Sequence, residues 1–238
     1  MHKSLLLFIS LLLCFTPVTY AYQDESVEPF RWDRQTTEKL KKSKVPIYVP
    51  TVVATSAITR RIGQLFVSQL DVNKDHYLFR ISRSRHQKLV NRNNLLPYDE
   101  LTMSAGTLPV YRKKPFATSD MFEKPEGSFT FRGYHVDYYL DKNILIWNHS
   151  NWEYIVWARN PNHAINIMER MMLCLNNDAT PVPDATRGQF VTFETKEGVI
   201  SDAGWSYDKE KLWYILTGRN TPEQLVKVLN SIVKLDTK

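Results

Sequence analysis

The stretch Trp152-Glu-Tyr-Ile-Val-Trp157, followed by Ala-Arg-Asn160-Pro161 and an apolar-periodic segment to Leu175, decides the fold. It predicts a strand, a tight loop and a helix that begins at Pro161 with Asn160 as its cap. A shorter version returns near the C-terminus as Leu212-Trp-Tyr-Ile-Leu216, Thr-Gly-Arg-Asn220-Thr-Pro222 and a second helix that runs to about residue 235. The two stretches therefore predict the same unit twice.

Counting aligns the two units residue by residue. An offset of 60 places Arg159 on Arg219, whereas the helices need an offset of 61 because Thr221 is inserted as the second cap. Each helix carries one apolar stripe at spacings of three and four residues. We predict an α+β fold in which antiparallel meander sheets are each packed by a C-terminal helix, through internal duplication of residues 128–175 and 188–235. The alternatives are a coincidence between two common units, or a repeat that serves the core alone.

The N-terminus predicts a secretory signal peptide over residues 1–21. After a short basic start, residues 4–15 are almost wholly apolar, and Thr19-Tyr-Ala21 ends the segment as a small-x-Ala cleavage site. The apolar run is shorter than the roughly 20 residues that span a bilayer, although retention as an uncleaved anchor is the alternative. Leu13 before Cys14 argues against lipid attachment there. We expect export to the periplasm or the extracellular space.

Beyond the leader we predict two parts, an N-terminal α+β part over residues 22–125 and the duplicated part over residues 126–238. In the first part the patterns indicate a short helix capped by Asp33, an edge strand interrupted by prolines at 45–53, and a hairpin with strands 64–70 and 76–81. Residues 95–114 read as loop, with a short extended piece at 108–111. The last helix is expected to end the chain.

Composition bounds the chemistry. The chain is 43% hydrophobic against 24% charged, which excludes general disorder. Its formal net charge is +6, or +5 once Lys3 leaves with the leader, and this charge permits attraction to anionic surfaces without requiring it. Cys174 is the only cysteine beyond the leader, so neither an internal disulfide nor an all-cysteine metal site can form. No cofactor and no metal site are predicted.

An aromatic strand before an Asn-Pro or Thr-Pro helix start, together with the opening Pro46-Ile-Tyr-Val-Pro50, resembles an uncharacterised domain of exported bacterial envelope proteins and lipoproteins. The resemblance covers about 50 residues twice, plus that opening, and it departs from the lipoproteins in lacking a lipid-attachment signal. It implies a role around the cell envelope. It implies no catalytic residues.

Motifs for catalysis are absent: there is no nucleophile elbow, Walker loop, dinucleotide fingerprint, EF-hand loop or zincin helix. Two carboxylate arrangements could still carry chemistry. His135 and Asp137 share one strand face, where they could form an acid–base pair. Asp202 and Asp208 flank Trp205, and Glu153 lies near Trp147 and Trp152, which is how carboxylates and aromatic rings are combined in a sugar site. Cys174 could serve as a nucleophile beside a histidine. The plain explanations are a solvated sheet face and, for Cys174, a small hydrophobe at a helix end.

The best candidate surface is basic. Residues 80–92 are rich in Lys and Arg, and Arg83, Arg85 and Lys88 are our ligand- or partner-binding candidates there. This stretch could contact an envelope protein, a lipid headgroup or a wall polymer, while export makes nucleic acid an unexpected partner. A solvated basic loop is the alternative.

Two further candidates are Arg159 and Arg219, because both stand at a strand–helix turn. They would define a partner site if they lined one groove. Our leading hypothesis is a non-enzymatic exported domain that binds a ligand or partner at the envelope. The alternatives are an exported hydrolase acting on cell-wall or glycan material, and a purely structural module of an envelope assembly.

Overall fold

The computed structural model describes residues 27–55, 63–84, 98–107, 124–139, 142–175, 182, 185–196, 198–207 and 211–235. Its helices are α2 (Arg34–Leu40), α4 (Pro161–Cys174) and α5 (Pro222–Asn230). Its strands are β1 (Val27–Pro29), β2 (Tyr48–Pro50), β3 (Val52–Ala54), β4 (Gln64–Val72), β5 (His76–Ser84), β6 (Tyr98–Thr107), β7 (Gly127–Phe131), β8 (Tyr134–Tyr139), β9 (Ile144–His149), β10 (Trp152–Trp157), β11 (Arg187–Thr195), β12 (Gly198–Tyr207), β13 (Leu212–Asn220) and β14 (Ile232–Lys234).

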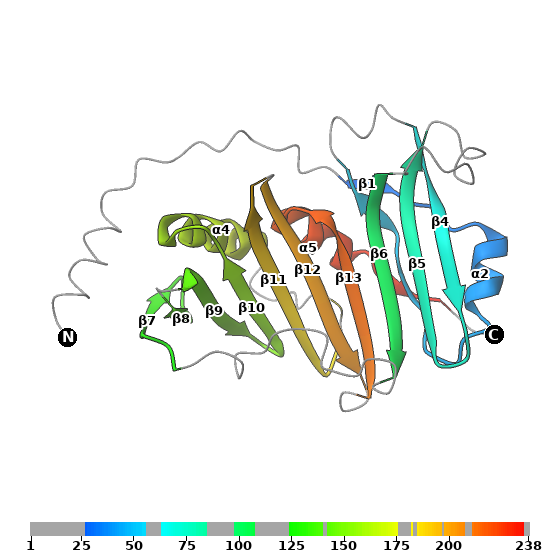
Figure 1. The fold of residues 1–238 in the computed structure, drawn as a ribbon. Helices are drawn as coiled ribbons and strands as arrows, with labels where there is room; N and C mark the ends of the chain where they lie inside the picture. Colours follow the sequence, from blue (N-terminus) through cyan, green and yellow to red (C-terminus); the bar gives the residue numbers. More distant parts are fainter. Residues whose placement is uncertain are drawn as a thin grey trace.

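Ten of these strands form one continuous sheet (Figure 1). Their order is β4-β5-β6-β13-β12-β11-β10-β9-β8-β7, and every neighbouring pair is antiparallel except β10 and β11. The predicted α+β class is therefore confirmed. We expected two meander sheets, but the strands before and after residue 125 lie in a single mixed sheet, because β6 pairs with β13 along its length.

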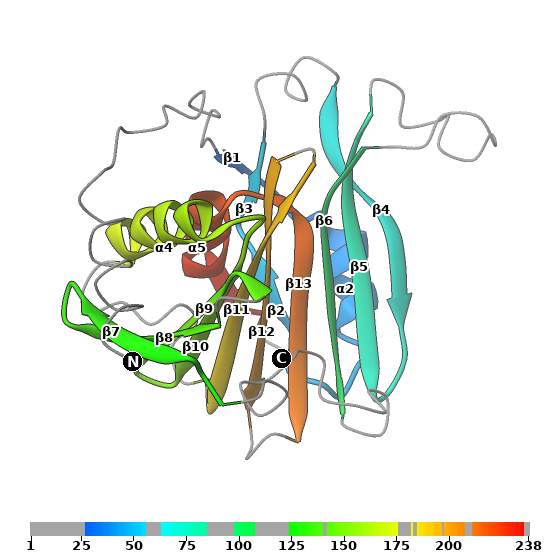
Figure 2. The same ribbon diagram turned by 60° about the vertical axis from the view of Figure 1, so that its left-hand side comes forward.

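The parallel pair explains where α4 lies. Two parallel neighbours cannot be joined by a tight turn, so the chain must cross a face of the sheet between them. The chain makes this crossing with α4, which packs on β9 and β10. The helix α5 packs on β12 and β13 beside it, so the two helices lie together on one face (Figure 2).

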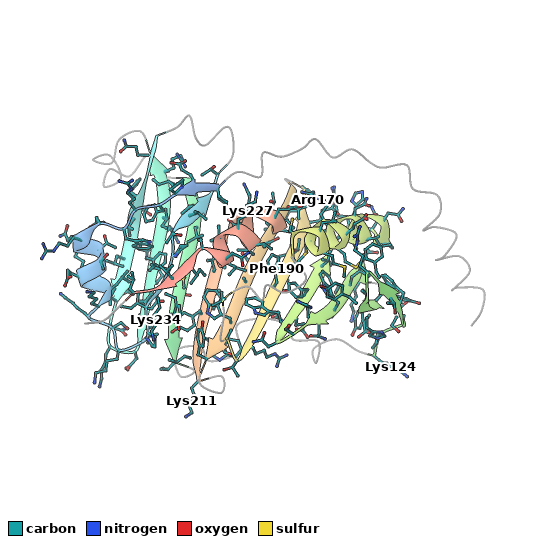
Figure 3. The ribbon with its side chains drawn as sticks, turned by 180° about the vertical axis from the view of Figure 1, so that it is seen from behind. Lys124, Arg170, Phe190, Lys211, Lys227 and Lys234 are labelled. Atoms are coloured by element: carbon teal, nitrogen blue, oxygen red, sulfur yellow. The ribbon has the colours of Figure 1, made fainter. Side chains whose placement is uncertain are left out.

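The helical face of the sheet carries the main core. The apolar stripe of α4 is buried as its spacing predicts, at Ala164, Ile167, Met168, Met171 and Met172. Seen from behind, α2 and the short strand pairs β1–β3 and β14–β2 cover the rest of this face (Figure 3). An ion pair of 2.6 Å between Arg170 Nε and Glu223 Oε1 joins α4 to α5.

Aromatic side chains line this face in register. Trp147 on β9 stacks on Tyr154 of β10, with 5.2 Å between ring centroids, and Trp205 stacks on Tyr214 at 5.5 Å. Gly188 on β11 stands between Trp152 on one neighbouring strand and Trp205 on the other. A glycine there leaves room for the two indoles.

The opposite face has a smaller apolar cluster of its own, formed by residues of β8 to β11: Tyr139, Ile144, Ile146, Ile155 and Val191, with Phe193 packed against them. The side chains of the five are at most 7% exposed.

Local signals predicted the helix starts correctly. Asp33 caps α2 and Asn160 caps α4, each by accepting a backbone N–H three residues on. Thr221 and Gln224 form the predicted capping box of α5. The predicted hairpin is β4–β5, and the proline-interrupted segment at 45–53 forms two short strands outside the main sheet.

Two predictions are wrong. Residues 98–107 are not loop as the sequence pattern suggests, because they form β6, which lies inside the sheet between β5 and β13. The C-terminal helix does not extend to about residue 235 but ends at Asn230, and β14 then pairs with β2. The predicted extended piece at 108–111 lies outside the described residues.

Candidate functional site

The end of β10 presents two exposed side chains of unusual type. Trp157 is 47% exposed, and it is the only exposed tryptophan of the chain, whose six tryptophans all lie within the described ranges. Two residues on, the Arg159 side chain is 56% exposed. Phe193 on β11 supports the Trp157 ring from the side, with centroids 6.3 Å apart. The other two aromatic residues of β10, Trp152 and Tyr154, are buried in the core.

A buried carboxylate holds Arg159 in place. The Glu194 side chain, 2% exposed, accepts from the backbone N–H of Arg159 at 2.9 Å and from its Nη2 at 2.6 Å. His163 Nδ1, in the first turn of α4, lies 2.8 Å from the same carboxylate. Burial alone would raise the pKa of Glu194, but the hydrogen bonds from Arg159 and His163 outweigh it and hold the pKa below its ordinary value.

The β8–β9 turn closes the other side of this corner. Asn143 donates its side-chain amide to the carbonyl of Arg159 at 3.1 Å, and its own carbonyl accepts from Ala158 N–H at 3.1 Å. The adjoining crevice, between the β8–β9 turn and the start of α4, has a volume of about 10 Å³, room for one water at most. Arg159 is thus fixed at its N–H, its carbonyl and its guanidinium. We call Trp157, Arg159, Phe193 and Glu194 the β10 corner.

Arg219 occupies the corresponding place at the end of β13. Strands β10 and β13 point the same way, because β10 is parallel to β11 and two antiparallel pairings separate β11 from β13. Both arginines therefore stand toward one end of the sheet. Three strand spacings, about 14 Å, separate them across the sheet, and they are also displaced along the strands because Asn220 shares a register row with Val156. The side chain of Arg219 lies outside the described residues, so whether the two line one groove stays a prediction.

The basic candidates of residues 80–92 divide into two groups. Arg83 is in the core, not on a surface: its side chain is 1% exposed and its Nη2 lies 2.8 Å from Glu28 Oε2 on β1. Its Nη1 donates to the carbonyl of Gly63 at 2.8 Å. Arg85 and Lys88 lie outside the described residues.

The His135–Asp137 pair lies far from the other candidate carboxylate, Asp202. His135 Nε2 lies 3.3 Å from Asp137 Oδ1 on β8, the strand next to the edge strand β7, with both side chains solvated. Asp137 and Asp202 share one register row, which runs from β8 through β9, β10 and β11 to β12. Four strand spacings, or about 19 Å, separate them, whereas paired glycosidase carboxyl groups lie about 5–9.5 Å apart.

Glu153 on β10 is not accessible as a second carboxylate for a glycosidase-type pair. It is only 4% exposed, and Gln189 on β11 donates a hydrogen bond to its carboxylate. Cys174 is half-buried at the end of α4. Of these candidates, only His135 and Asp137 form a close, solvated pair, and Asp202 lies about 19 Å from it.

Asp202 remains notable by itself. It lies at a β-bulge between Ser201 and Ala203, where β12 and β13 slip in register, and bulges often mark functional positions. The backbone N–H of Gly218 donates to its Oδ1 at 3.4 Å. Burial raises the pKa of Asp202 from 3.8 to about 6.

We expect Asp202→Asn to stabilise the protein at neutral pH. The unfolded carboxyl ionises near pH 3.8 and the folded one near 6, so the native state loses stability as pH rises through this window and stays lower above it. At 1.36 kcal/mol per pH unit the loss is at most about 3 kcal/mol, and partial exposure reduces it to about 1–2 kcal/mol.

In urea unfolding, the free energy of unfolding of the variant should therefore exceed that of the natural chain by about 1–2 kcal/mol at pH 8 and by almost nothing at pH 3.5. The substituted amide keeps an acceptor oxygen for the Gly218 N–H, so the comparison isolates the charge. An equal difference at both pH values would show that the ionised carboxylate carries no penalty.

The fold and the site together describe an α+β protein with a large mixed sheet and an exposed Trp–Arg corner. Within the described ranges, no helix is long and apolar enough to cross a membrane, and no three His, Cys, Asp or Glu side chains gather as metal ligands do. Comparison of the chain with protein families, with curated proteins and with solved structures found no match in any of the three.

Proposed function

We propose that this chain is an exported, non-enzymatic module that binds a protein partner in the cell envelope through the β10 corner. One observation carries the proposal: Trp157 and Arg159 are both exposed, while hydrogen bonds hold Arg159 at its backbone and guanidinium and Phe193 contacts the Trp157 ring. Trp and Arg dominate the energetics of protein interfaces. A side chain that is already ordered loses little entropy when a partner docks on it.

The dispersal of the catalytic candidates supports binding over hydrolysis. An exported hydrolase remains the alternative, favoured only by the raised pKa of Asp202, which suits a general acid. If that alternative holds, the purified chain should release sugars from wall polymer and Asp202→Asn should abolish the release. We expect no release from either protein.

Export rests on the leader and on the resemblance to envelope domains. We propose cleavage after Ala21, which removes only residues that precede β1. Mass spectrometry of the chain recovered from the envelope should find Tyr22 at its N-terminus. A mass that includes residues 1–21 would indicate a retained anchor instead.

We also propose that residues 128–175 and 188–235 arose by duplication. The matched helix starts support this, since each helix has proline at its first position behind a polar cap. The common direction of β10 and β13 supports it too. On this view the β10 corner is the copy that acquired an exposed tryptophan, because the residue aligned with Trp157 is Thr217.

Removal of the Arg159 side chain should weaken partner binding without unfolding the protein. With a photoreactive phenylalanine analogue at position 157, the chain should crosslink to one envelope protein. We expect Arg159→Ala in the same chain to reduce this product at least about tenfold, the loss of a hot-spot contact.

The matched control places the same analogue at Leu173, an exposed apolar residue on α4 that is 59% exposed. It should give no specific product. Equal products from positions 157 and 173, or a product that survives Arg159→Ala, would contradict the proposed site.

A further inference from the structure

Basic residues concentrate in and around α2. Six basic and two acidic side chains fall within residues 31–44, a net charge of +4, whereas the whole chain carries +6. The basic residues are Arg31, Arg34, Lys39, Lys41, Lys42 and Lys44. The segment around α2 is therefore strongly basic for its length.

The fold turns these side chains outward. Asp33 caps α2, and Thr36 and Leu40 are buried on the side of α2 that faces the sheet, where the helix contacts β4. Arg34, Lys39 and Lys42 consequently lie exposed on the outer side. With Gln35 and Glu38, they line a shallow hollow of about 470 Å³.

A second segment extends the basic surface. The backbone N–H of Lys44 donates to the carbonyl of Lys74 at 2.9 Å, which ties the β4–β5 turn to the end of α2. Both lysines are exposed. We call Arg34, Lys39, Lys42, Lys44 and Lys74 the α2 surface.

Acidic residues near the α2 surface only partly offset it. Glu38 lies 3.9 Å from Lys41, and Asp71 lies 3.6 Å from His76. Together with Asp33 and Asp75 they make four acidic side chains against seven basic ones in residues 31–44 and 71–75, a net charge of +3.

We propose that the α2 surface docks the protein on the anionic phospholipid headgroups of a bilayer. Its cations come from a helix, the segment after it and a hairpin turn, and they spread over an outward-facing end of the molecule. A headgroup layer meets such a surface with all its lysines at once, whereas a single polymer chain needs a groove to follow. Each lysine near an anionic membrane contributes attraction that salt screens.

Docking at the α2 surface leaves the β10 corner free. Helix α2 lies beside β4, the first strand of the sheet, and β10 is six strand spacings or about 29 Å away along it. Figure 1 shows the two at well-separated places. The protein would then hold its partner while resting on the membrane.

Vesicle sedimentation tests this proposal with the chain from residue 22 onward, since the apolar leader would itself partition into lipid. Vesicles of phosphatidylcholine with phosphatidylglycerol should bind the protein, and vesicles of phosphatidylcholine alone should not. We expect the triple variant Lys39→Gln, Lys42→Gln, Lys44→Gln to bind at least about tenfold more weakly at low salt.

The matched control removes the same charge elsewhere, through Lys124→Gln, Lys196→Gln and Lys211→Gln. Lys124 lies at the opposite end of the sheet from α2 (Figure 3). Lys211 lies at the turn before β13, at the lower end of the sheet in the same view. This variant should bind nearly as well as the natural chain.

Three outcomes would overturn the inference. An equal loss in both triple variants would show a net-charge effect with no defined surface. Binding to phosphatidylcholine alone would show that charge does not drive it. Tighter binding to soluble polyphosphate than to vesicles would assign the α2 surface to an anionic polymer. The β10 corner and its crosslinks are unaffected by any of these results.

Discussion

Gly188→Val is expected to leave the chain without a native core at room temperature. A Cβ at this position would overlap the fused-ring atoms of Trp152, and Trp205 lies on the other neighbouring strand. Both indoles are 0% exposed, so neither ring can turn away in a close-packed interior. Overpacking costs about 1–3 kcal/mol, and a branched side chain that must displace an indole costs more.

Gly188→Ala should be less severe, at about 3 kcal/mol of a total stability of roughly 5–15 kcal/mol. Urea unfolding followed by tryptophan fluorescence measures the loss. Gly133→Ala is the control, because a Cβ at that position would meet nothing within 4 Å and only the positive φ of 86° is unfavourable.

A double variant identifies the cause. If overlap with the indole destabilises Gly188→Ala, the combination with Trp152→Leu should cost less than the sum of the two single changes. If the two changes are strictly additive in free energy, or if Gly188→Ala costs no more than Gly133→Ala, the Trp152 ring adjusts to the added Cβ without strain.

Sequence predicted what short-range chemistry determines. Asn160, Asp33 and Thr221 each cap a helix through a residue three places on, and such pairs are visible in the sequence itself. Strand β6 was missed because it lacks any such local pairing. Its inward side chains, Leu101, Met103 and Ala105, do alternate with a period of two, but that alternation is short, and its partner β13 comes from far along the chain.

The site was only half predictable. Arg159 emerged from the repeat, but Glu194, which orients it, lies 35 residues away, and no spacing rule connects the two. The surface prediction for Arg83 was wrong although a signal existed. Tyr77, Phe79 and Ile81 alternate inward on β5, and Arg83 continues that alternation into the core. The run of basic charge around it concealed the period of two.

The buried position of Arg83 leads to an asymmetric prediction for its ion pair. The Arg83 side chain is 1% exposed and that of Glu28 is 36% exposed. Glu28→Ala removes the carboxylate that compensates the buried Arg83 guanidinium. This change should lower the free energy of unfolding by about 3 kcal/mol. Arg83→Met fills a similar volume and leaves a carboxylate that water can solvate, so it should cost less than about 1 kcal/mol.

Denaturant unfolding of the two single variants and of the double variant measures this asymmetry. The free energy of unfolding of the double variant should equal that of Arg83→Met, because neither variant contains the buried guanidinium. Hydrogen exchange should show faster opening of β1 and its partner β3 in Glu28→Ala, since the ion pair ties β1 to β5. The loss should persist in high salt, which screens buried pairs little. If Arg83→Met costs as much as Glu28→Ala, the pair stabilises through packing and not through the compensation of a buried charge.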